Sequence, residues 1–159
     1  MSDQAAHGAG GAMQDDPDAK FDLKDFLPYL LNISAEVTSS GFADNYKREY
    51  GMTRTQWRVL FHLGRYGEMT ARDICTRSRT HKTKVSRAVS ALEDIRFLKR
   101  QRNLDDRRFE SLCLTAEGHK AYKTLCGKAG SYDRMLMSQF TPEENAILRR
   151  CLRQLANLP

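Results

Sequence analysis

The sequence predicts a mainly α-helical fold of the α+β class, with six helices and one short β-hairpin. Apolar residues recur at three-and-four spacing along the six segments, as amphipathic helices require. Residues 97–115 instead alternate apolar and polar side chains around an Asp-Asp step, which is typical of a two-stranded hairpin. The length of 159 residues suits one domain, or one domain with a dimerisation extension.

The first predicted helix follows a polar N-terminal segment. Residues 1–20 contain almost no apolar side chains and cannot bury enough surface to order themselves, so we expect a disordered tail. The helix should have Pro28 at its first position, where the missing N–H has no cost, and should continue to about Glu49. Gly51 then ends it. The residues at helical spacing on one face are Leu23, Phe26, Leu27, Leu30, Ser34 and Val37.

Two capping boxes predict the starts of the next two helices. Thr53 can accept a hydrogen bond from the first turn while Gln56 reaches back to it. The helix that follows should end near residues 64–67, which contain two glycines. Thr70 and Asp73 have the same spacing, so they predict a second helix start.

The second box opens a short helix over residues 71–78, and a further helix is predicted from Lys82 to about Arg96. The connection between them is tight, because only Arg79, Thr80 and His81 separate the two. The apolar face of the second of these helices consists of Val85, Ala88, Val89, Leu92 and Ile95.

Two helices are predicted after the hairpin. Thr115 is the expected cap of a long helix that continues to about Gln139. The last helix has Thr141 as its cap, Pro142 at its first position and two glutamates in its first turn. Its apolar stripe consists of Leu148, Cys151, Leu152 and Leu155.

The positive charge of the chain is concentrated in its middle third. Residues 65–108 contain thirteen Lys and Arg against six Asp and Glu, whereas the rest of the chain is close to neutral within a net charge of +6. Such clustering is expected of a protein that binds the phosphates of nucleic acid. Composition alone leaves open a solvated basic face without a partner.

A short helix, a tight connection, a basic helix and a hairpin together predict a winged helix-turn-helix. In this module the second helix enters the major groove of DNA and presents its N-terminal residues to the bases. Arg and Lys can donate to guanine, while Ser and Thr can contact bases or phosphates. The DNA-binding residues predicted on and before this helix are Thr70, His81, Lys82, Thr83, Lys84, Ser86 and Arg87.

The tip of the hairpin, NLDDRR, places two acids beside two arginines in this basic region. We expect Asp106 to pair with Arg108 and hold it extended, so that the arginine enters the minor groove already oriented. A narrow minor groove has a negative potential that attracts arginine. Arg107 would then contact a phosphate. Turn chemistry alone could also explain the two aspartates.

Three segments of the chain resemble the MarR (multiple antibiotic resistance regulator) family of transcription factors. DDRRFESLCLTAEG resembles the family's wing, with Asp106 and Arg108 at the tip and Leu114, Thr115 and Gly118 after it. MTRTQWRVL resembles the second helix, and KTKVSRAVSALE resembles the recognition helix. The resemblance extends over residues 22–157.

The resemblance implies a homodimer that represses transcription by binding a palindromic operator, with a small ligand, often an aromatic acid, as inducer. Residues 52–115 would bind DNA, while residues 21–50 and 116–159 would form dimerisation helices of the same single regulator domain, 21–159. Two departures from the family stand out. Arg96 and Phe97 replace a glycine-containing turn after the recognition helix, and Thr80 occupies a usually apolar position.

The signal that the regulator senses is weakly specified. The residues near the place where the resemblance puts a ligand are Tyr29, Asn32, Trp57, Arg58 and His62. Redox sensing is an alternative, with Cys75 beside Arg72 and Arg77 as its best candidate. A third alternative is an architectural DNA-binding or protein-interaction module without ligand response. We expect Cys75 and the other cysteines, Cys113, Cys126 and Cys151, to be mostly small core residues without a disulfide.

Several classes of function are not indicated. No catalytic fingerprint, metal-ligand spacing or cofactor motif occurs, so we expect neither an enzyme nor a metal or cofactor site. No apolar run approaches the roughly 18 residues that a membrane span needs, and no secretory signal is visible. We therefore expect a cytoplasmic protein.

Overall fold

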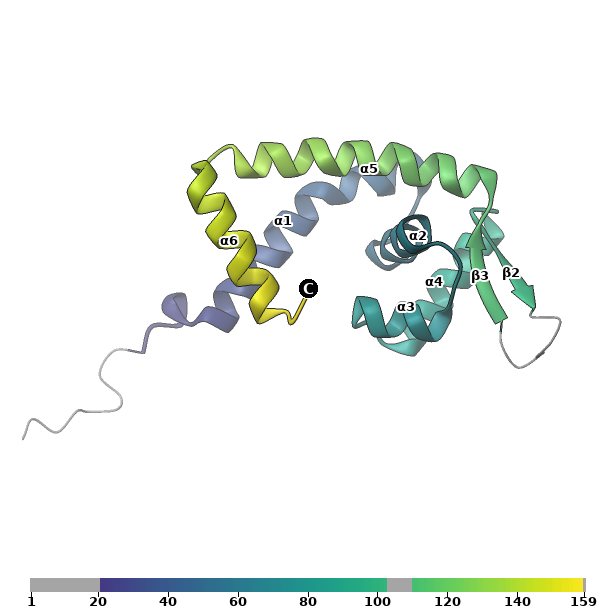
Figure 1. Cartoon of the computed structure of the whole chain (residues 1–159), viewed down its shortest axis with the longest axis horizontal. Coiled ribbons are helices and arrows are strands. Elements are labelled where there is room, and N and C mark those ends of the chain that lie inside the picture. The colour runs from purple at the N-terminus through teal and green to yellow at the C-terminus, as the bar shows by residue number, and fades with distance from the viewer. Residues whose placement is uncertain (1–20, 103–109, 159) are drawn as a thin grey trace, which may run out of the picture. The chain divides into compact units, whose positions relative to one another are not determined.

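The computed structural model describes residues 21–102 and 110–158 of the chain. These residues divide between Thr38 and Ser39 into two compact units. The predicted tail and the hairpin tip, including Asp106, Arg107 and Arg108, lie outside the described residues. The elements, shown in Figure 1, are η1 (Leu23–Asp25), α1 (Leu27–Tyr50), α2 (Arg54–Tyr66), β1 (Met69–Thr70), α3 (Ala71–Ser78), α4 (Lys82–Asp94), β2 (Leu98–Arg102), β3 (Glu110–Leu114), α5 (Ala116–Met137) and α6 (Pro142–Leu155).

The first unit contains a short 3-10 helix that the sequence did not predict. Leu23 lies within η1 and Phe26 caps it, so both precede α1 instead of belonging to its first turn. The reason is Pro28, the second residue of α1, because a proline ring is tolerated in the first turn but blocks the helix from extending further back. The carboxylate of Asp22 accepts a 2.9 Å bond from the Lys24 N–H and caps η1.

Helix starts in the second unit follow the predicted capping chemistry. Both bonds of a capping box are present at Thr53 before α2, at Thr70 before α3 and at Thr141 before α6. Each box satisfies two backbone N–H groups that a helix start would otherwise leave without a partner. Pro142 occupies the first turn of α6, as predicted.

The turn after α4 explains how the chain manages without the expected glycine. Arg96 has a φ of 59°, in the left-handed region that glycine favours. Its N–H donates to the Glu93 carbonyl and the Phe97 N–H donates to the Leu92 carbonyl, both at 2.8 Å. These two bonds form a Schellman motif, in which the left-handed residue is usually a glycine.

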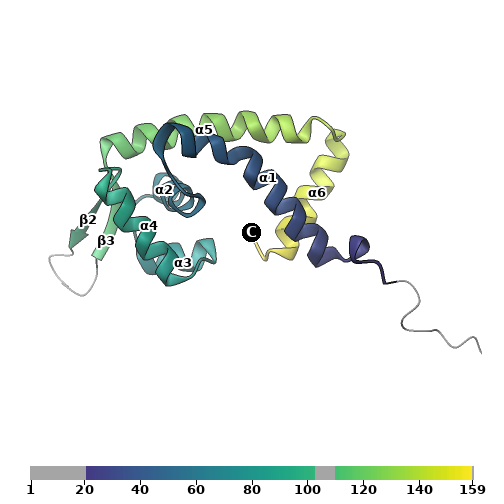
Figure 2. The ribbon, with the colours of Figure 1, turned by 180° about the vertical axis from the view of Figure 1, so that it is seen from behind.

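The predicted hairpin is present and belongs to a three-stranded sheet of order β1-β3-β2. β2 and β3 pair antiparallel, with Leu98 opposite Leu114 at one end and Arg102 opposite Glu110 at the other. β1 adds an antiparallel edge on β3. Figure 2 shows β2 and β3 from behind. The sequence did not predict β1, because a strand of two residues is too short to show a period.

A hydrogen bond joins the start of α5 to the turn that follows α4. The Thr115 hydroxyl accepts a 3.0 Å bond from the Gly118 N–H and donates to the Arg96 carbonyl at 2.7 Å. A Cβ on Gly118 would lie 1.9 Å from the Phe97 carbonyl oxygen, so only glycine fits there. This contact gives a physical reason for the Leu-Thr-x-x-Gly pattern after the hairpin.

The buried core lies in the second unit and runs from Phe42 near the end of α1 to Leu125 in α5. It packs α2, α3 and α4 against the sheet. Two expectations about the core were wrong. Ile95 is 43% exposed, because α4 ends at Asp94 and does not include it. All four cysteines are half-buried instead of fully buried.

Candidate DNA-binding face and effector cavity

The two faces of α4 differ sharply in burial and in charge. Val85, Ala88, Val89 and Leu92 are buried against the core, none of them more than 4% exposed. The spacing of 3.6 residues per turn places the polar positions on the opposite side. The exposed residues there are Lys82, Thr83, Lys84, Ser86 and Arg87. The helix therefore offers a basic face that core packing holds toward the solvent.

Two other residues of the predicted set are already engaged as helix caps. The ring Nδ1 of His81 accepts a 3.3 Å bond from the Thr83 N–H at the start of α4. The Thr70 hydroxyl donates to the Asp73 carboxylate at 2.7 Å and accepts from the Asp73 N–H at 3.1 Å. His81 remains exposed beside the basic face, whereas the hydroxyl of Thr70 is occupied within its own helix start.

The connection between α3 and α4 is closed by Arg79 and Thr80. Arg79 has a φ of 48°, and its guanidinium donates a 2.6 Å bond to the Ala156 carbonyl at the end of α6. Thr80 is half-buried at the position where the family resemblance implies an apolar residue, and its hydroxyl donates to the Ser78 carbonyl at 3.1 Å. The hydroxyl thus has a partner, which makes the substitution tolerable.

Arg100 joins β2 to its neighbours. Its Nε lies 2.8 Å from the Glu93 carboxylate on α4, and its Nη1 lies 2.7 Å from the Glu110 carboxylate on β3. The hydrogen bonds that Arg100 donates to Glu93 and to Glu110, in that order of importance, raise the pKa of its guanidinium above the ordinary value. A planar guanidinium held from two sides has a fixed orientation.

A cavity of about 420 Å³ lies between α2 and α3. It combines aromatic rings with two guanidinium groups and a histidine. The Arg77 guanidinium also lies 4.6 Å from the centre of the Tyr66 ring, a cation–π distance. The lining residues are Trp57, Arg58, Phe61, His62, Arg77 and Ser78.

The electrostatics of this cavity favour an anion. Burial, followed by the charges of Arg77 and Arg58, lowers the pKa of His62 below its ordinary value. The buried Nδ1 of His62 has no hydrogen-bond partner among the described residues. Burial also lowers the pKa of Arg58, and the charge of Arg54 adds to this effect. An organic anion would relieve the repulsion among these cations.

Three of these residues, Trp57, Arg58 and His62, were predicted from the sequence as candidate ligand contacts. The other three lining residues, Phe61, Arg77 and Ser78, were not. Arg77 and Ser78 reach the cavity from the far end of α3, a placement that depends on how α3 packs on α2. Tyr29 and Asn32 belong to the other compact unit and are not among the residues that line the cavity.

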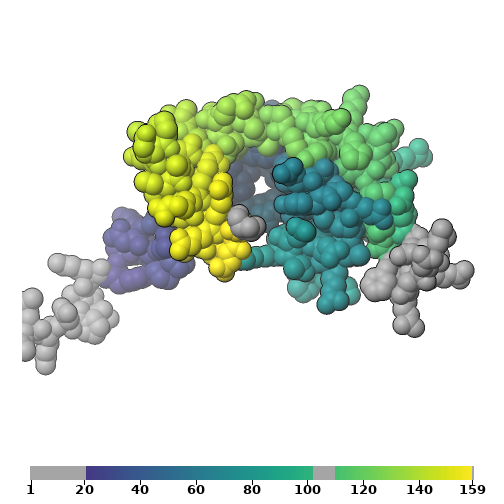
Figure 3. Space-filling model, viewed as in Figure 1, coloured from purple at the N-terminus to yellow at the C-terminus, as the bar shows by residue number. Residues whose placement is uncertain are grey.

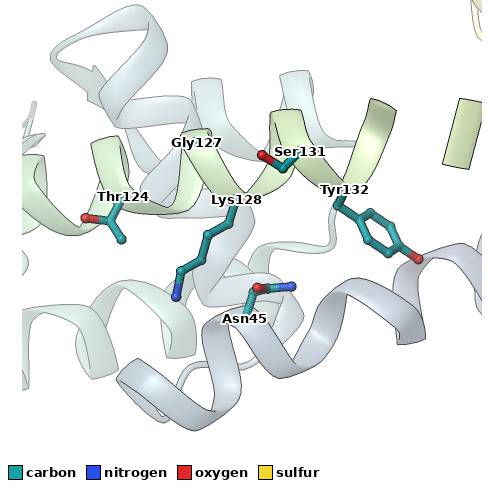
Figure 4. A pocket seen from close by; sticks show the side chains of 6 residues that line it. All are labelled: Asn45, Thr124, Gly127, Lys128, Ser131 and Tyr132. Carbon is teal, nitrogen blue, oxygen red and sulfur yellow. The ribbon is translucent and has the colours of Figure 1, made fainter. Parts of the chain in front are cut away.

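Two other hollows on the described residues also have polar side chains in their walls. One, of about 470 Å³, is lined from α3, α4 and β2 and contains Cys75 and Arg100. The other, of about 530 Å³, lies between α1 and α5, where Figure 4 shows Asn45 facing the side chains of α5. Its cation, Lys128, is already paired with Glu49, and small polar residues form most of the wall. This groove therefore offers little to an aromatic anion.

The described residues contain no group of three or more metal-ligating side chains. Across residues 21–102 and 110–158, no helix combines the length and the apolar character that crossing a bilayer requires. Of the cysteines, Cys75 packs against the core from its place in α3. The prediction that Cys75 senses oxidants stays a prediction.

A basic, solvent-facing helix that follows a short helix and a tight turn, and precedes an antiparallel hairpin, defines a winged helix-turn-helix protein, a class that binds double-stranded DNA. Residues 50–108 match the sequence model of the MarR family. Over its winged module, the chain is therefore similar to the MarR family of transcriptional regulators.

Two known transcriptional regulators are similar to this chain over most of its length. YwoH, an HTH-type transcriptional regulator of Bacillus subtilis, is 26% identical over 118 residues, which cover 74% of this chain and 85% of YwoH. A MarR/EmrR regulator of Acinetobacter shares the fold, with a TM-score of 0.78, 22% identity and 86% and 96% of the two chains covered.

Two similar structures were solved for proteins whose partners are known. BpsR of Bordetella bronchiseptica, whose DNA binding is regulated by 6-hydroxynicotinic acid, has a TM-score of 0.79 at 17% identity, with 88% and 99% of the chains covered. MepR of Staphylococcus aureus, in complex with DNA, has a TM-score of 0.73 at 22% identity, with 83% and 97% covered.

Proposed function

We propose that this regulator is a homodimeric repressor that binds a palindromic operator and leaves it when a small aromatic acid binds. The basic face of α4, held outward by the buried face beneath it, is the observation that carries the DNA part. Lys84 and Arg87 would contact base edges in the major groove. Arg108, oriented by Asp106, would enter the minor groove, while Arg107 and the hydroxyls of Thr83 and Ser86 would contact phosphates.

In this proposal, the middle of the chain binds DNA and its two terminal parts pair the subunits. Residues 52–115 would bind DNA, and residues 21–50 and 116–159 would pair two copies. In support, neither α6 nor the described part of the first unit, residues 21–38, has a buried residue. Their apolar side chains are exposed in the single chain, with Val37 at 65% and Leu155 at 54%. Figure 3 shows the surfaces of α6 and of the winged module, α2 to β3, in space-filling form.

A second copy of this chain is the occupant that best fits those surfaces. The apolar residues lie on both terminal parts of the chain, and twofold dimers use the same patch on each subunit. Large apolar surfaces that stay exposed on a monomer usually mark an interface. The exposed large apolar residues concerned are Leu27, Leu30, Ile33, Val37, Ile147, Leu152 and Leu155.

The effector would bind in the cavity between α2 and α3. Its carboxylate would lie among Arg58, His62 and Arg77, and its ring against Trp57 and Phe61. BpsR responds to an acid of this kind, and PcaV of Streptomyces coelicolor has been solved with its natural ligand. A regulator of this type would act in the cytoplasm, where the operator is.

The DNA part is tested by fluorescence anisotropy with the full chain, the DNA upstream of its own and neighbouring genes, and random competitor. We expect a preference for one upstream site of at least about 10³-fold over random DNA. Lys84→Ala and Arg87→Ala should weaken binding and relax the choice of base at individual positions. Arg48→Gln, an exposed ion-paired position on α1, serves as the control. Equal affinity for every duplex would instead identify an architectural DNA-binding protein.

The effector part is tested by calorimetry with 6-hydroxynicotinate and benzoate, and with benzamide as the uncharged control. Both carboxylates should bind and benzamide should not, because the cavity's cations require an anion. Arg58→Gln and Arg77→Gln should each abolish binding while the chain stays folded. Equal binding of benzamide and benzoate would contradict the assignment of the cavity.

A further inference from the structure

The surface between α4 and β2 contains a second cluster of cations that the proposed DNA contacts do not use in full. The hollow of about 470 Å³ at this place is lined by Arg72 from the first turn of α3, Lys82 and Ser86 from α4, and Arg100 from β2. Its apolar wall includes Ala71 and Val89. Cations from three separate elements thus face one space.

The geometry of duplex DNA determines what must cross this surface. The major and minor grooves are separated by a single sugar–phosphate strand. If α4 lies in the major groove and the hairpin reaches the adjacent minor groove, that strand has to pass between α4 and β2. The hollow is lined by residues of α3 and α4 and by Arg100 of β2, so the strand would pass over it.

We propose that Arg72, Lys82 and Arg100 form a seat for one backbone phosphate of this strand. The inference rests on the proposed function, because it takes the positions of α4 and the hairpin on DNA from it. Arg72 and Lys82 lie in the first turns of two helices, where the helix dipole adds positive potential. The hydroxyl of Ser86 supplies a neutral donor beside them.

Arg100 is prepared for this role by its two carboxylates. Glu93 and Glu110 bind its Nε and Nη1, so the plane of the guanidinium is fixed while Nη2 is not used by either carboxylate. The side chain is 34% exposed and is therefore reachable from outside. The arrangement explains why acids are tolerated on a DNA-binding surface, since they orient an arginine before DNA arrives.

The experiment measures the affinity of the full chain for operator and random duplexes between roughly 50 and 200 mM salt. Losing a whole phosphate contact lowers the magnitude of the slope of log K against log salt by about 0.9. Because three cations share the phosphate, Arg72→Gln or Arg100→Gln should lower it in a dimer measurably, by up to about 1.8. Both variants should weaken operator and random DNA by the same factor, because phosphate contacts carry no sequence information.

Two controls separate this role from a structural one. Arg100→Lys keeps the charge, so it should keep most of the slope even though it loses the bond to one carboxylate. Arg48→Gln removes the same charge from an ion pair on α1 and should leave the slope unchanged. If Arg100→Gln fails to fold because it frees β2 from α4, Arg72→Gln still decides the question.

An unchanged slope in Arg72→Gln and Arg100→Gln, with Lys84→Ala and Arg87→Ala still losing operator binding, would overturn the phosphate seat and leave the proposed function intact. A shifted base preference in either of the first two variants would also overturn it. No operator preference in the unaltered chain would instead refute the proposed function.

Discussion

At the scale of single residues, two arginines hold backbone positions that a glycine would adopt at lower cost. Arg79 and Arg96 have φ values of 48° and 59°, each just after a helix. Left-handed conformations cost ordinary residues about 1–2 kcal/mol. Among the described residues, Arg79 gains a hydrogen bond to the Ala156 carbonyl in return, whereas the side chain of Arg96 has no such bond.

Arg96→Gly is therefore expected to raise the free energy of unfolding by about 0.5–1 kcal/mol, because it relieves the strain of the Schellman motif after α4. Urea unfolding at a fixed protein concentration measures this change. Arg79→Gly is the matched control, since its gain is offset by the lost bond to Ala156, and it should be neutral or destabilising. A loss of stability in Arg96→Gly would contradict this explanation.

His62 should make the stability of the protein depend on pH. Its pKa in the folded chain lies below 6.5, chiefly because of burial and then because of Arg77 and Arg58. The unfolded chain therefore binds a proton at higher pH than the folded chain does. The stability from neutral His62 is fully present above pH 6.5 and is lost as pH falls through the lowered pKa.

Unfolding measured from about pH 8 down to about pH 5 should accordingly show a decline that His62→Gln reduces. Stability that rises as the pH falls through this range would show that the imidazolium form is the favoured one. Added 6-hydroxynicotinate should flatten the decline if it binds beside His62, because an anion favours the protonated ring.

At the scale of elements, two of the three glycines of α5, Gly118 and Gly127, should respond in opposite ways to the same change. Gly118 has the Phe97 carbonyl oxygen 1.9 Å from the place of a Cβ, whereas nothing lies within 4 Å at Gly127. Gly118→Ala should destabilise by about 1–3 kcal/mol through the forced shift of the turn after α4. Gly127→Ala should stabilise by up to about 1 kcal/mol, because alanine favours a helix.

Thermal unfolding of the two variants at equal concentration makes this comparison directly. The pair shares one helix and one substitution, so a difference in sign can come only from the local contacts. Equal changes in stability at both positions would mean that the close contact between Gly118 and the Phe97 carbonyl does not constrain the fold.

The helices and the hairpin could be predicted because their signals are local. Thr53 with Gln56 and Thr70 with Asp73 form their bonds within one helical turn, so spacing alone reveals them. After α4, the apolar residues change from helical spacing to alternation with polar residues, and this change likewise predicted β2 and β3. For the turn after α4, the sequence showed only that the usual glycine is absent. The left-handed backbone conformation of Arg96 was not predicted.

Other elements and contacts depend on packing between distant segments. β1 exists because Met69 meets Leu112 on β3, a pairing that no period within two residues can indicate. Arg77 reaches the effector cavity, and Arg100 reaches the hollow beside α4, only after α3 and β2 have packed. The sequence thus identified the exposed polar residues of α4, whose contact with DNA stays a prediction, but did not place Arg72 and Arg100 beside them.

At the scale of the whole molecule, the described chain is a winged module with terminal helices that it cannot bury. Exposed Ile147, Leu152 and Leu155 should pack against a second copy, so Leu155→Asp should convert a dimer to monomers. Analytical ultracentrifugation measures the change. Operator affinity should fall as well, because a monomer contacts only one half-site.

Ile95→Asp is the control for the dimer, since Ile95 is 43% exposed but belongs to the winged module. It should leave the association state unchanged. A Leu155→Asp variant that sediments as the unaltered protein does would exclude this face of α6 from the dimer contact.

The measurement that tests the central claim most directly is dimethyl sulfate footprinting on the operator, because the reagent methylates guanine N7 in the major groove and adenine N3 in the minor groove. The account predicts guanine protection in two half-sites about 10 base pairs apart, with adenine protection beside each. Arg108→Ala should remove only the adenine protection, and Arg87→Ala should weaken the guanine protection. Bound protein that leaves guanine N7 fully reactive would contradict the placement of α4 in the major groove.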